Sequence, residues 1–141
     1  FKNKNEYQNI EMQRFIERHG LHDFKMNPHF PVISLQIIRG AVAAEMDGYL
    51  EDYIDKVLVH MWEEPKKMDD PEVIKSAFEE SGLDAEKLIS QMQDADVKAK
   101  LIANTEAAAE RGVFGIPTFF VGEEMYFGKD NLWQVEEKLS E

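Results

Sequence analysis

The segment Gly-Val-Phe-Gly-Ile-Pro-Thr-Phe-Phe-Val, residues 112–121, constrains the fold of this chain more than any other stretch. Gly112 ends a helical pattern, Ile116-Pro117 makes a turn, and the aromatic and β-branched run Thr118–Val121 is typical of a strand. A second short run, Met125–Phe127, follows after a turn over residues 122–124. Because the glycine in that turn tolerates a positive φ, the two runs predict an antiparallel β-hairpin.

The remaining segments follow the 3.6-residue period of amphipathic helices. We predict helices over residues 2–19, 35–47, 49–62, 71–81, 85–92 and 131–139, and a longer one that starts at Asp94 or Asp96 and ends at Glu110. An extended connection is expected over 21–32. Ser34, Asp70 and Asp84 are the expected N-caps, and Pro71 suits a first helical position. An isolated two-stranded hairpin is only marginally stable, so its presence among so many helices is the main structural question that the sequence raises.

Two sets of apolar residues are expected to face the core. Along the helix 35–47 the periodicity selects Leu35, Ile38, Val42 and Met46. The large aromatic side chains Trp62, Trp133, Phe114, Phe119 and Phe120 are also interpreted as core rather than as a ligand site.

Composition limits the possible partners. The chain has 141 residues, 43% hydrophobic and 31% charged, which suits one globular domain. A net charge of −12 disfavours nucleic acids and anionic membrane surfaces, because both are bound through Lys and Arg. The chain has no cysteine, no apolar run near the roughly 20 residues of a membrane span, and no secretory leader. It begins at Phe1 rather than Met, and we expect a cytoplasmic location.

Two segments could carry chemistry. If the Ile116-Pro117 bond is cis, the backbone of Ile116 points outward and could pair with an extended peptide-like ligand; otherwise Pro117 only ends a turn. In Gly-Lys-Asp-Asn at 128–131, helix-start amides favour a ligand carboxylate, and Asp130 either caps the helix or binds an ammonium group. The four histidines show no ligand spacing typical of zinc, so we predict no metal site.

The motifs Gly-Val-Phe-Gly-Ile-Pro-Thr-Phe (112–119) and Phe-Gly-Lys-Asp (127–130), with Phe30–Arg39 and Met61-Trp62, resemble one known family. This is the 2-hydroxychromene-2-carboxylate isomerase family, allied to kappa-class glutathione transferases within the DsbA-like thioredoxin superfamily. The resemblance covers essentially the whole chain. It implies a thioredoxin-like α/β fold of the DsbA/kappa type, with residues 1–112 as a helical insertion and 113–141 as the C-terminal ββα part.

The resemblance also implies a glutathione site. Pro117 would be the family's cis-proline, and the backbone of Ile116 would pair with the cysteinyl part of glutathione. The amide of Lys129 or Asp130 would take the γ-glutamyl carboxylate, and the Asp130 side chain its ammonium group. The helical insertion would form a wall around a small conjugated oxo-acid substrate.

One departure from the family is equally specific. Its members begin with a β-α-β unit that carries the active-site serine and an asparagine contact to glutathione, and neither has a counterpart here. The sequence is therefore expected to hold no catalytic residue and to be inactive by itself. The strands of that unit would complete the sheet.

The resulting prediction is part of a glutathione-dependent isomerase of the 2-hydroxychromene-2-carboxylate type. The alternatives are a DsbA-like thiol-disulfide oxidoreductase, a kappa-type glutathione transferase, or a non-catalytic helical interaction module. In the last case the hairpin edge would pair with a partner or with a second copy in a homodimer.

Overall fold

The computed structural model describes residues 2–140. The chain divides into two compact units, and the boundary between them lies between Lys98 and Ala99. The boundary falls inside one long helix, whereas the division predicted from the sequence follows the end of that helix, so the predicted division stays a prediction. Within the described residues, no helix combines the length and the apolarity that crossing a bilayer requires.

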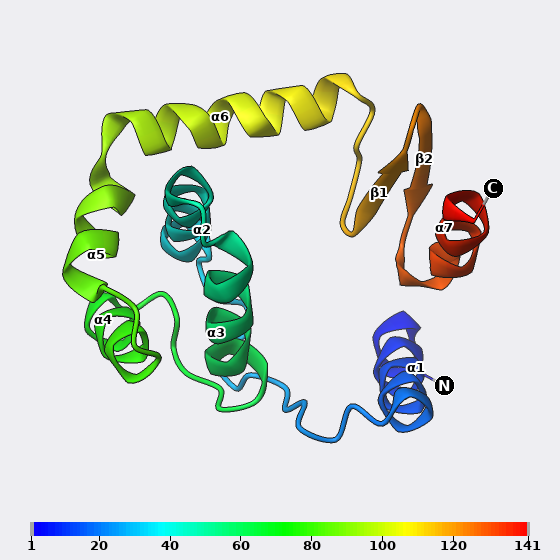
Figure 1. Cartoon of the computed structure of the whole chain (residues 1–141). Coiled ribbons are helices and arrows are strands. Elements are labelled where there is room, and N and C mark those ends of the chain that lie inside the picture. The colour runs from blue at the N-terminus through cyan, green and yellow to red at the C-terminus, as the bar shows by residue number, and fades with distance from the viewer. Residues whose placement is uncertain (1, 141) are drawn as a thin grey trace. The chain divides into compact units, whose positions relative to one another are not determined.

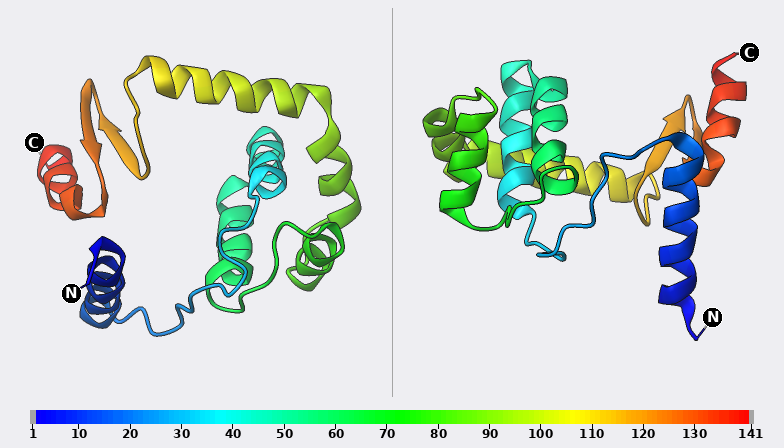
Figure 2. Two further views of the ribbon diagram at one scale, coloured as in Figure 1. Left: turned by 180° about the vertical axis from the view of Figure 1, so that it is seen from behind. Right: turned by 90° about the horizontal axis from the view of Figure 1, so that it is seen from below.

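The first unit is built from helices, with a long connection over residues 20–34 between the first two (Figure 1). They are α1 (Lys4–His19), α2 (Leu35–Asp47), α3 (Leu50–Trp62), α4 (Pro71–Glu80) and α5 (Ala85–Gln93), and the unit includes the start of α6 (Ala95–Glu110). Helix α2 packs against both α3 and α5, and α4 packs against the same two helices. Figure 2 shows α2 and α3 side by side from two further directions. The core between these helices contains the fully buried side chains of Tyr53, Phe78, Met68 and Leu88.

Helix α2 faces the core with a different set of residues from the one predicted, and three of the five are Gly or Ala. The buried positions are Ile37, Gly40, Val42, Ala43 and Ala44, whereas Leu35, Ile38 and Met46 are exposed, so only Val42 was predicted correctly. The cause is close packing: a Cβ built on Gly40 would collide with the hydroxyl of Tyr53 and lie 2.7 Å from Cε of Met92. Periodicity that counts only large apolar residues selects the wrong face here.

Local capping signals predict the helix starts well, with one exception. The side chain of Asp70 accepts from the backbone N–H of Glu72 at 3.1 Å, and that of Asp84 accepts from Lys87 at 3.1 Å. Both caps are confirmed. Ser34 occupies the predicted N-cap position of α2, but its backbone is already helical and its side chain makes no capping hydrogen bond, so the position is confirmed and the capping bond is absent.

The second unit confirms the predicted hairpin. Strands β1 (Thr118–Val121) and β2 (Glu124–Phe127) pair antiparallel, with Thr118 opposite Phe127 and Val121 opposite Glu124. Gly122 has the positive φ that the two-residue connection needs, and β2 starts one residue earlier than predicted. A short 3-10 turn, η1 (Lys129–Asn131), leads into α7 (Leu132–Leu139), which packs on both strands (Figures 1 and 2).

The second unit buries very little. Among the described residues after Val97, none is buried. Phe114 is 72% exposed and Trp133 is 58% exposed, so their prediction as core residues is wrong for this chain. Two strands and one helix cannot enclose large aromatic side chains, because each face of a sheet needs a layer packed against it.

Candidate functional site

The turn before β1 presents unpaired backbone. The Ile116-Pro117 peptide bond is cis, and Ile116 is 90% exposed. Within residues 2–140, neither the N–H nor the C=O of Ile116 makes a hydrogen bond. Such a pair of groups can bind an extended ligand in the way that neighbouring strands pair.

The turn after β2 presents a second set of polar groups. Gly128 has φ +86°, so the chain leaves the strand in a conformation that favours glycine. The Asp130 carboxylate is 82% exposed and pairs with the ammonium group of Lys129. Its backbone N–H donates no hydrogen bond in the part of the chain that the structure describes.

Asp130 is not a helix cap. Gly128 occupies the N-cap position of η1 and Asn131 that of α7, and neither helix start has a side-chain capping bond. The capping alternative for Asp130 is therefore wrong. Instead, the side chain of Asn131 reaches back to the carbonyl of Phe127 at 2.6 Å and holds the turn closed.

The structure brings the two predicted segments together within the second unit. The N–H of Gly128 donates to the carbonyl of Pro117 at 2.9 Å, which joins the residue after Ile116 to the turn that carries Lys129 and Asp130. The hydroxyl of Thr118 donates to the carbonyl of Gly115 at 2.6 Å and fixes the other side of the Ile116 turn. All the predicted site residues thus belong to one hairpin end.

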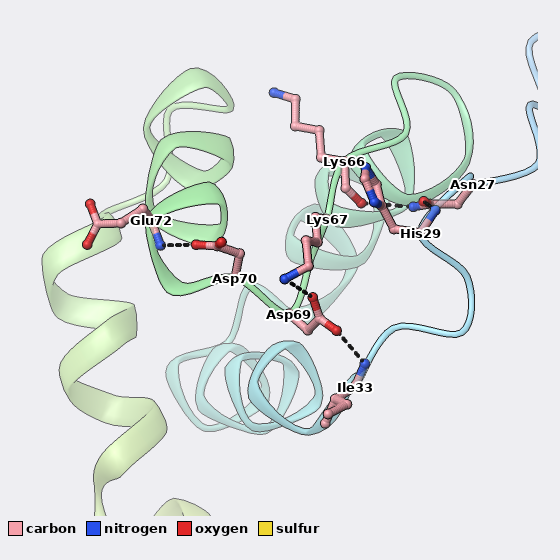
Figure 3. A network of polar contacts seen from close by, with 8 residues as sticks. All are labelled: Asn27, His29, Ile33, Lys66, Lys67, Asp69, Asp70 and Glu72. Atoms are coloured by element: carbon pink, nitrogen blue, oxygen red, sulfur yellow. Dashed lines mark hydrogen bonds and ion pairs between the residues drawn. The ribbon is translucent and has the colours of Figure 1, made fainter.

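The first unit holds a polar cluster that the sequence analysis did not single out (Figure 3). The side-chain amide of Asn27 is only 2% exposed and donates to the carbonyls of Met61 at 3.1 Å and Lys66 at 2.9 Å. Its oxygen accepts from the N–H of His29 at 2.9 Å. These bonds satisfy the side chain within the protein, so Asn27 serves as a structural anchor for the connection before α2. The Asn-Pro pair at 27–28, a common turn signal, could have indicated it.

A second set of polar contacts in Figure 3 holds the connection before α2 in place. The N–H of Ile33 donates to the carboxylate of Asp69 at 3.1 Å, and Lys67 lies 3.5 Å from the other carboxylate oxygen. The hydrogen bond from Ile33, and next the charge of Lys67, lower the pKa of Asp69. The Phe30-Pro31 bond between these two anchors is also cis.

Two open hollows lie within the first unit. An open hollow of about 390 Å³ lies against α4 and α5, lined in part by Pro71, Lys75 and Ile89. Another of about 580 Å³ surrounds the turn between α2 and α3. Across residues 2–140 there is no group of three or more His, Asp or Glu side chains placed to hold a metal ion.

Sequence comparison assigns the family. The chain belongs to the DsbA-like thioredoxin domain family, whose model matches residues 1–140. Among individual relatives, it is 25% identical to the 2-hydroxychromene-2-carboxylate isomerase of Pseudomonas putida over 139 residues, which is 98% of this chain and 66% of that protein. It is 26% identical to human glutathione S-transferase kappa 1 over 138 residues, 85% of this chain and 61% of that protein.

Structural comparison agrees with this assignment. A solved structure of 2-hydroxychromene-2-carboxylate isomerase superposes with a TM-score of 0.82 at 25% identity, over 97% of this chain and 66% of that one. The resemblance predicted from the two sequence motifs and the DsbA-like thioredoxin fold are therefore confirmed. The chain spans about two thirds of the length of these relatives.

Proposed function

We propose that this chain is part of a glutathione-dependent isomerase of the 2-hydroxychromene-2-carboxylate type. One observation carries the proposal: a member of the DsbA-like family has the unpaired backbone of Ile116 beside the turn with Lys129 and Asp130. The names of its relatives, an isomerase and a glutathione transferase, support an enzyme.

The residues present fit glutathione. The free N–H and C=O of Ile116 match the backbone of its cysteinyl residue, and the N–H of Asp130 is available for the γ-glutamyl carboxylate. The Asp130 carboxylate is exposed to an incoming ammonium group, which would share it with Lys129. The net charge of −12 does not oppose this, because the carboxylate would meet backbone amides rather than side chains.

In this proposal the chain's residues bind and orient, and none of them reacts. When bound, glutathione would supply the nucleophilic thiolate for reversible addition to a small conjugated aromatic oxo acid. Ile116 holds the central cysteinyl residue of the tripeptide and Asp130 holds its γ-glutamyl end, so the sulfur is kept in one place. The serine that stabilises the thiolate belongs, in this proposal, to a β-α-β unit outside these 141 residues. A cytoplasmic location is part of the proposal, because thiols and glutathione are kept reduced there.

Isothermal titration of the complete gene product with glutathione tests the site. A hydrogen bond to a charged group contributes about 1.5–3 kcal/mol, so Asp130→Ala should weaken binding roughly ten- to 150-fold. Glu136→Ala on α7, which removes an equal exposed charge, should bind as the wild type does. No binding by the wild type, or equal affinity of the Asp130→Ala variant, would refute the proposed site.

Two related functions are separated by one further observation. The family model favours a DsbA-like thiol oxidoreductase, and the human relative favours a kappa-type transferase. A Cys-x-x-Cys pair in the gene upstream of Phe1 would support the oxidoreductase, whereas a single serine would support the isomerase or the transferase. Turnover of a chromene carboxylate, compared with conjugation of an electrophile to glutathione, would then distinguish the last two.

A further inference from the structure

The phenyl ring of Phe127 fills the space beside Gly115. A Cβ built on Gly115 would lie 2.8 Å from Cε2 and 3.2 Å from Cζ of that ring. Gly115 does not have the positive φ found at Gly112 and Gly128, so its backbone conformation does not require glycine. The absence of a side chain at residue 115 is therefore explained by space, and the ring of Phe127 is what occupies that space.

This contact lies between the two halves of the proposed glutathione site. Gly115 immediately precedes Ile116, and Phe127 immediately precedes the Gly128–Asp130 turn. We propose that Gly115 and Phe127 form a positioning pair, which sets the distance between the Ile116 backbone and the Asp130 turn. This inference rests on the proposed function, and neither residue is assigned a contact with glutathione.

Gly115 and Phe127 each make further contacts besides the one between them. The carbonyl of Gly115 accepts from the Thr118 hydroxyl at 2.6 Å. Phe127 is paired with the same Thr118 across the hairpin, and its carbonyl accepts from the side chain of Asn131 at 2.6 Å. Its ring also packs on Phe114, with 4.7 Å between the ring centroids. A side chain introduced at residue 115 would collide with the ring of Phe127, and these contacts mean that the residues next to both would be displaced as well.

The expected consequence is a change in spacing rather than the loss of a ligand contact. A methyl group at residue 115 pushes the ring away and separates the backbone of Ile116 from the turn. A ligand that must contact both Ile116 and the Asp130 turn then loses the geometry of at least one hydrogen bond. This corresponds to about a tenfold loss of affinity.

The test compares Gly115→Ala, Phe127→Leu and the double variant in the complete gene product. Leucine lacks the Cε and Cζ atoms that collide with the new methyl group. We expect Gly115→Ala to bind glutathione about tenfold more weakly, and the double variant to return to within about twofold of Phe127→Leu alone. Met125→Leu, on the same strand, serves as the control and should leave the affinity unchanged.

A second measurement needs no ligand. In ligand-free protein, the amide NMR signals of Ile116 and Asp130 should both shift in Gly115→Ala and return toward those of Phe127→Leu in the double variant. If Gly115→Ala does not fold, the double variant must fold and bind, and a double variant that does neither refutes the inference.

The two measurements separate the inference from the function on which it rests. Wild-type protein that does not bind glutathione would refute the function, while the NMR signals would still report on the pair. Wild-type affinity in Gly115→Ala, or unmoved signals at either residue, would refute the positioning role and leave the function intact.

Discussion

Replacing Asn27 should destabilise the first unit more than any surface change of similar size. Asn27→Ala removes three hydrogen bonds, two to the carbonyls of Met61 and Lys66 and one from the N–H of His29, from a side chain that is 2% exposed. At about 1 kcal/mol for each bond, the free energy of unfolding should fall by about 3 kcal/mol. Urea titration followed by far-UV circular dichroism measures it, with an unchanged slope if the native state is otherwise intact.

Two further variants make this prediction specific. Asn27→Asp keeps the acceptor but replaces the donor with an oxygen facing two carbonyls, so it should be less stable than Asn27→Ala. Asn9→Ala is the matched control within the same unit: this asparagine is exposed on α1, so its loss should change stability by at most about 0.5 kcal/mol. A loss below about 1 kcal/mol in Asn27→Ala, or wild-type stability in Asn27→Asp, would refute the anchoring role.

Two other predictions concern the same unit. Gly40→Ala should cost about 1–3 kcal/mol in urea titration, because its Cβ meets the hydroxyl of Tyr53. Tyr53→Phe alone loses the hydrogen bond from that hydroxyl to the carbonyl of Ile37 at 2.8 Å. The comparison is therefore a double-mutant cycle, in which Gly40→Ala should cost less in the Tyr53→Phe background than in the wild type, and equal costs would contradict the contact. Burial, and next the charge of Lys66, lower the pKa of His60, whose ring lies 2.7 Å from the Ser81 hydroxyl. On lowering the pH, the unfolded chain therefore protonates this histidine at a higher pH than the folded chain does. The free energy of unfolding should accordingly fall as the pH drops below about 6.5. His60→Gln should weaken this dependence of stability on pH. Parallel pH profiles for the wild type and the variant would disprove the role of His60.

The helices and the hairpin could be predicted because their signals are local. Asp70 and Asp84 cap helices whose first turns are adjacent in sequence, and Gly122 sits inside the turn that it forms. The inward face of α2 could not be predicted, since it depends on how closely α3 and α5 approach Gly40. The burial of Asn27 and His60 has the same origin, because their partners lie 34 and 21 residues away.

Only part of the candidate site could be predicted from the sequence. The motif around Ile116-Pro117 and the Phe-Gly-Lys-Asp turn indicated the family, and the family is confirmed. Their adjacency rests on the bond from Gly128 to Pro117, which depends on the register of the hairpin. The contact between Gly115 and Phe127 was not foreseen, because a glycine before an Ile-Pro pair resembles any turn glycine.

Among the described residues after Val97 none is buried, and this should affect hydrogen exchange in the second unit. A segment with few buried contacts opens locally at low free energy, so its amides exchange faster than those between α2, α3 and α5. Because a ligand binds only the closed hairpin, its apparent affinity is reduced by the fraction of molecules in which the hairpin is open. A polypeptide that packs on the rest of the hairpin, and leaves the Ile116 and Asp130 turns open, would therefore slow exchange there and raise the affinity of those turns for their ligand without touching the ligand itself.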